Sequence, residues 1–123
     1  MTNSQTTSST TYTNLTTAGP SATVTVPYSG KVLVTLTALM SNCSDNEDGY
    51  MSFQVDTTAI VTATLDATAL RFNDDANLHF QGSATYVVSG LYTNSPHTFT
   101  AKYRTGGGTE TFANRSIIVI PLP

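Results

Sequence analysis

The stretch VLVTLTA at positions 32–38 alternates apolar and hydroxyl side chains from Val34 onward. Val32, Val34, Leu36 and Ala38 fall on one face of an extended chain, and Thr35 and Thr37 fall on the other. A period of two is typical of a β-strand with one buried face. Similar alternation recurs in three later segments, 51–55, 61–65 and 98–103, with turn-forming residues between them. We therefore predict an all-β fold, an antiparallel jelly-roll β-sandwich of about eight strands.

The composition favours the same fold class. The 123 residues are the length of one domain, and only 11% of them are charged, against roughly 25% in a typical soluble domain. The polar surface is instead built from hydroxyls, because the chain has 24 threonines, whose branched side chains suit a pleated sheet. One apolar run, 117–120, has no polar face, so we expect it in mid-sheet or under a partner.

Charge and cysteine content exclude several partners. The net charge is −3 and the five basic residues are scattered, which argues against nucleic acid. A single cysteine, Cys43, permits no disulfide within the chain. The N-terminus lacks the basic and apolar regions of a secretory signal, and no stretch is apolar enough for a membrane helix. We expect the chain to fold in a cytoplasm and not to bind membranes.

Residues 1–20 form a separate compositional unit. They are mostly Thr, Ser and Asn, with Tyr12 and Leu15 as the large apolar residues, and end at Gly19-Pro20. Composition alone predicts disorder here. We therefore predict an N-terminal arm, 1–20, that Tyr12 and Leu15 anchor to another protein, and a sandwich domain, 21–123. The alternative is that the arm completes a sheet of its own domain.

The sequence contains no recognisable motif of catalytic residues. The histidines His79 and His97 and the lone Cys43 have no partners at the spacing of known nucleophile or metal motifs. We predict that the chain is not an enzyme and has no cofactor. Three glycines at 106–108 are not followed by a helical pattern, so they indicate a hairpin turn and not a phosphate loop.

Two acidic loops suggest a calcium site only if they meet in space. The first contains Asp45, Glu47 and Asp48, and the second contains Asp74 and Asp75. Calcium takes several oxygens from flexible loops, but the first loop has Val55 where an EF-hand needs its glutamate. We therefore interpret these residues as solvated loop charges and predict no metal.

Several segments resemble the small jelly-roll domains of tailed-phage structural proteins, which are similar to tumour-necrosis-factor-like trimers. The resemblance is carried by YTNL (12–15), TVTV (23–26), GKVLV (30–34), YVVSGL (86–91), SPHTFTAKYR (95–104) and FANRSIIVI (112–120). It implies a homotrimeric virion protein, a capsid decoration or head-fibre protein that folds in the host cytoplasm. The arm would attach it to the major capsid protein or another virion protein. The resemblance implies no catalytic residue.

Two alternatives stay open. One is a host-binding tail-fibre tip and the other is a bacterial carbohydrate-binding or adhesive module. In the tail-fibre tip, Tyr28, Tyr50 and Tyr92 on predicted loops would stack on the sugar rings of a surface glycan. For the trimer, three aromatic residues are candidate axis contacts, with a core role equally open: Phe99, Tyr103 and Phe112.

Overall fold

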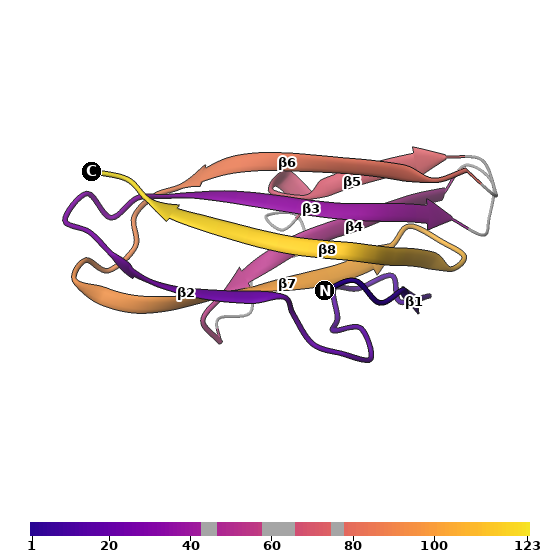
Figure 1. Cartoon of the computed structure of the whole chain (residues 1–123), viewed down its shortest axis with the longest axis horizontal. Helices are drawn as coiled ribbons and strands as arrows, with labels where there is room; N and C mark the ends of the chain where they lie inside the picture. The colour runs from indigo at the N-terminus through magenta and orange to yellow at the C-terminus, as the bar shows by residue number, and fades with distance from the viewer. Residues whose placement is uncertain (43–46, 58–65, 75–77) are drawn as a thin grey trace.

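The computed structural model describes residues 1–42, 47–57, 66–74 and 78–123, which form two packed β-sheets (Figure 1). The described strands are β1 (Gln5–Thr7), β2 (Ser21–Val26), β3 (Val32–Asn42), β4 (Glu47–Val55), β5 (Leu70–Asp74), β6 (Phe80–Val88), β7 (Ser95–Thr105) and β8 (Glu110–Pro121). All their pairings are antiparallel. The predicted eight-stranded β-sandwich is confirmed. No described helix is long and apolar enough to cross a membrane.

The strand order is that of a jelly roll. Sheet A has the order β1-β8-β3-β6, and sheet B has the order β2-β7-β4-β5. The chain thus folds as nested pairs, β1 with β8, β2 with β7, β3 with β6 and β4 with β5, wrapped into two layers (Figure 1). Since β7 and β8 lie in different sheets, the predicted hairpin at 106–108 is wrong, and these glycines connect the two sheets instead.

The core lies between the sheets and follows the alternation of the strands. In β3 the inward residues are Val32, Val34, Leu36, Ala38 and Met40, and each of them is fully buried. Opposite them, β7 and β4 contribute aromatic rings, including Phe53 and Phe99 with centroids 6.1 Å apart. Burial of side chains of this size contributes roughly 1.5–3 kcal/mol each.

The aromatic residues considered for a trimer axis belong to this core. Phe99, Tyr103 and Phe112 each have 0% exposure. The rings of Tyr103 and Phe112 pack against each other at 4.8 Å between centroids. Their strands point these side chains inward, so they offer no surface to another copy, and their assignment to the axis is corrected to a core role.

The N-terminal arm is part of the sandwich. Strand β1 extends sheet A by pairing with β8. Further along the arm, Thr13 exchanges two backbone hydrogen bonds with Tyr103, at 2.9 and 3.0 Å, and Leu15 is 5% exposed within the core. Residue 20 therefore does not separate two structural units. The alternative, that the arm completes a sheet of its own domain, describes the structure.

A buried arginine in β8 also holds the arm in place through hydrogen bonds. Arg115 in β8 is 1% exposed and donates to the Gly19 carbonyl at 3.4 Å and to Gln5 Oε1 at 3.3 Å. Its backbone also exchanges two hydrogen bonds with Met1, at 2.9 and 2.7 Å. One residue near the C-terminus thus contacts both ends of the arm, which explains how a segment so poor in apolar residues is ordered.

Candidate functional site

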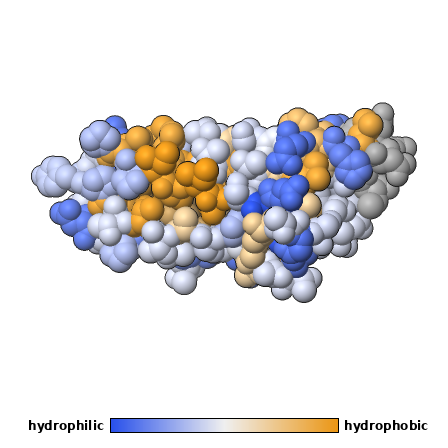
Figure 2. All heavy atoms as spheres, in the orientation of Figure 1, coloured by the Kyte–Doolittle hydropathy of each residue, from blue (hydrophilic) through white to orange (hydrophobic). Residues whose placement is uncertain are grey.

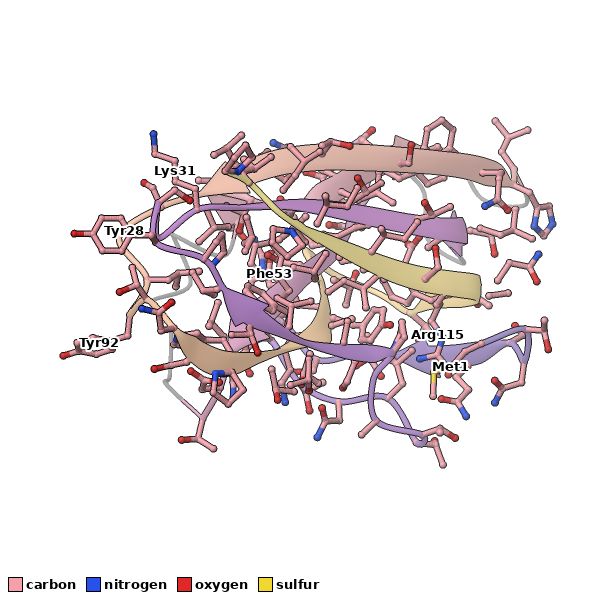
Figure 3. The ribbon with its side chains drawn as sticks, turned by 60° about the vertical axis from the view of Figure 1, so that its left-hand side comes forward. Met1, Tyr28, Lys31, Phe53, Tyr92 and Arg115 are labelled. Carbon is pink, nitrogen blue, oxygen red and sulfur yellow. The ribbon has the colours of Figure 1, made fainter. Side chains whose placement is uncertain are left out.

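Two of the three predicted ligand-facing tyrosines are open to solvent at one end of the sandwich. Tyr28 is 88% exposed in the turn between β2 and β3, and Tyr92 is 84% exposed in the loop between β6 and β7. Figure 3 shows both side chains projecting from the same end of the molecule. We call residues 27–31 and 89–94 the tyrosine platform.

Backbone hydrogen bonds join the two segments of the platform. The Leu91 amide donates to the Gly30 carbonyl at 3.1 Å, and the Asn94 amide donates to the Val26 carbonyl at 2.8 Å. Gly30 has a φ of +70°, and a Cβ there would lie 3.0 Å from the Leu91 carbonyl oxygen. Glycine therefore permits both the turn and the close approach of the loops. A platform organised in advance loses little backbone entropy when a ligand binds.

His97 ties the Tyr92 loop to the end of β4. Its side chain is buried, with Nδ1 2.7 Å from an oxygen of Asp56 and Nε2 3.0 Å from the Tyr92 carbonyl oxygen. Both partners are acceptors, so only the doubly protonated ring satisfies both contacts. The hydrogen bond with Asp56, and then that with the Tyr92 carbonyl, raises the pKa of His97. The Thr98 amide and then His97 lower the pKa of Asp56.

This contact predicts a pH dependence of stability. The pKa of His97 in the folded state lies above its ordinary value of 6.5. The contribution of the His97–Asp56 contact to the free energy of unfolding is therefore complete below pH 6.5. This stabilisation is lost as the pH rises through the raised pKa of His97. It is also lost in acid, as the pH falls below 3.8 and through the lowered pKa of Asp56. An NMR titration of the His97 ring should give a pKa above 6.5, and Asp56→Asn should lower it. A pKa at or below 6.5 in the unsubstituted chain would contradict this.

Tyr50, the third predicted ligand-facing tyrosine, is not available to a ligand. It lies within β4 and not in a loop, and it is 8% exposed. The Arg104 guanidinium lies 3.7 Å from the centroid of its ring, and that of Arg71 lies 5.4 Å from it. Cation–π contacts with both arginines therefore cover the ring on the outer face of sheet B. Its assignment as a ligand-facing residue is corrected.

The same cluster holds Tyr12 of the arm. Tyr12 donates to Asp66 at 2.5 Å, and Arg104 makes two hydrogen bonds to the same carboxylate, at 3.0 and 2.6 Å. The hydrogen bond with Arg104 lowers the pKa of Asp66, although burial opposes it. Burial and the contact with Asp66 raise the pKa of Tyr12. Tyr12 and Leu15 thus contact their own domain, and they could anchor the chain to another protein only by leaving these contacts.

The acidic segments also meet in the structure. Glu47 pairs with Asp74 in the register of β4 and β5, while Asp45, Asp75 and Cys43 lie outside the described residues. Burial would raise the pKa of Asp48, but hydrogen bonds from Asn73, Tyr50 and Arg71 together lower it. Within the described ranges, no group of three or more His, Cys, Asp or Glu side chains could hold a metal ion.

Comparisons with known proteins identify no family for this chain. No protein-family model matches the sequence, and no curated protein matches it. A solved structure titled "EclA C-terminal domain; sugar-binding protein" is similar at 16% identity and a TM-score of 0.44, over 96% of this chain and 79% of that one. Similarity at this level transfers neither a ligand nor a residue role to the chain.

Proposed function

We propose that this chain is a carbohydrate-binding module whose ligand stacks on the tyrosine platform. The observation that carries the proposal is the exposure of Tyr28 and Tyr92, 88% and 84%, on two loops that hydrogen bonds join. An aromatic ring offers a rigid apolar face, and its hydroxyl supplies a polar contact at the rim. A sugar ring has the matching surface, with C–H groups on its face and hydroxyls around its edge.

The surroundings of the platform suit a neutral or weakly charged glycan. Lys31 is exposed beside Tyr28 (Figure 3), while the two other ionisable side chains described nearby, Asp56 and His97, pair with each other. A ligand would therefore meet two rings, backbone groups and one cation. The tail-fibre-tip and bacterial-module alternatives both use this surface in the same way.

The virion-decoration hypothesis stays a prediction. Its arm would have to leave the domain in order to bind a capsid protein, because Tyr12 and Leu15 are already engaged. One observation favours an assembling protein, namely the uncharged outer face of sheet A described in the next subsection. A decoration protein would then assemble through that face and not through the arm.

Loss of either ring should weaken glycan binding. Tyr28→Ala and Tyr92→Ala should each cost about 1–2 kcal/mol, or roughly 5–30-fold in Kd, as for an aromatic contact at the centre of an interface. Screening on a glycan array, followed by calorimetry with the best ligand, provides the measurement. Tyr28→Phe keeps the ring and should bind within about threefold of the unsubstituted chain.

The control variant is Leu78→Ala, which alters another exposed apolar residue, outside the platform. It should leave Kd unchanged. If the double variant Tyr28→Ala/Tyr92→Ala binds as tightly as the original chain, the platform is not the site. If a broad array yields no ligand, the proposed function fails.

A further inference from the structure

The outer face of sheet A carries a cluster of exposed apolar side chains. Val87 is 59% exposed, Ile118 is 52% exposed and Ile120 is 48% exposed. The strand register places Leu33 of β3 directly between Val87 of β6 and Ile120 of β8. Figure 2 shows an apolar area on this face, over the strands seen in the same view in Figure 1. We call these four residues the apolar patch.

The rest of this face is uncharged. The strands of sheet A contain only two charged residues, Glu110 and Arg115, which are 0% and 1% exposed. Beyond the apolar patch, hydroxyl residues continue along the strands, as in the Thr35–Thr85 pair, whose side chains hydrogen-bond at 2.9 Å. Lys31 marks the edge, just before β3 begins. Sheet B, by contrast, has Arg71, Lys102 and Arg104 on its strands.

We infer that the outer face of sheet A binds the same face of a second copy of this chain. A charged partner would have to desolvate its ions against a face that offers none in return. A second copy has an equally uncharged face. When the two faces pack together, the residues that give each chain its net charge of −3 lie outside the contact. The paired threonine hydroxyls already satisfy one another, so their burial costs less than that of unpaired groups.

The size of the face is sufficient for such a pair. Strand β3 has 11 residues, and a strand of that length spans ~37 Å at the usual rise, while three neighbouring strands cover ~14 Å across. Their product is ~500 Å² for each copy, or ~1,000 Å² in total, which reaches the lower limit of a specific interface. Two sheets packed face to face at about 10 Å are a standard arrangement.

This pairing also accounts for the apolar run 117–120. Along this run β8 pairs with β3, whereas β1 pairs only with residues 110–112 of β8, and the outward residues Ile118 and Ile120 stay half exposed in the single chain. A second copy would cover them. One flat face that binds its own equivalent gives a closed two-fold pair, whereas a trimer needs two different contact surfaces. The inference does not depend on glycan binding, because the contact between copies is made by the outer face of sheet A and not by the rings of Tyr28 and Tyr92.

Light scattering after size-exclusion chromatography tests the inference. The full chain should have twice the 13.0 kDa mass of one copy. Ile118→Lys, and independently Val87→Lys, should shift the mass to one copy, while circular dichroism of the strands stays unchanged. The matched control is Thr25→Lys on β2, which adds the same charge at an exposed position of sheet B and should leave the pair intact.

Three results would overturn the inference. These are a mass of one copy at every concentration, a mass of three copies, and a pair that persists in folded Ile118→Lys and Val87→Lys variants. If one of the two lysine variants unfolds, the other decides, because the two substitutions lie on different strands.

Discussion

Deletion of residues 1–17 should leave a chain that does not fold stably. The deletion removes β1, the backbone pairing of Thr13 with Tyr103, and Leu15 from the core. Loss of a buried leucine alone costs roughly 2–5 kcal/mol, which is a large part of the 5–15 kcal/mol that typically stabilises a domain. It also exposes Arg115 and takes Tyr12 away from Asp66 and Arg104. We expect a total loss above about 5 kcal/mol.

Thermal unfolding followed by circular dichroism measures this loss. Leu15→Ala should give an intermediate effect, and Thr16→Ala, at an exposed position of the same arm, should give none. If the truncated chain melts at the temperature of the full chain, the arm is separable, and its role as an anchor to another protein regains support.

The sandwich itself could be predicted from the sequence because alternation is a local signal. In β3, the residues at 32, 34, 36 and 38 were assigned to one face, and the structure buries all four. The exposure of Tyr28 and Tyr92 followed similarly from the turn residues beside them. Both predictions require only the neighbours of each residue along the chain.

Other features depend on contacts between distant residues, which composition does not reveal. The arm is ordered by Arg115 and Tyr103, which are far from it in sequence. Tyr50 follows an acidic, glycine-containing segment that suggests a loop, yet the register of β4 with β5 and β7 places two arginines over its ring. The glycines at 106–108 signal a turn, but a turn does not determine whether its strands pair.

Tyr103→Ala should be among the most destabilising single substitutions in the chain. The side chain has 0% exposure, its ring packs on Phe112, and its hydroxyl donates to the Gly19 carbonyl at 2.8 Å. The Arg115 guanidinium lies 5.4 Å from the ring centroid. Truncation of a buried aromatic residue costs roughly 3–5 kcal/mol, mostly through the cavity that it leaves. Denaturant unfolding should show this loss in the midpoint without a change in slope.

Tyr103→Phe separates the packing of the ring from the hydrogen bond to the arm. It keeps the ring against Phe112 and leaves the buried Gly19 carbonyl without its hydroxyl donor, which costs about 1–2 kcal/mol. Burial raises the pKa of Tyr103 to about 12, so below pH 10 its hydroxyl stays a donor, and the difference between the two chains should be constant there. A residue at a trimer axis would behave differently. Its truncation would change the mass of the assembly and would leave the stability of each single chain unchanged. If Tyr103→Ala unfolds at the denaturant midpoint of the original chain but changes the assembly, the residue acts between copies and its core role is refuted.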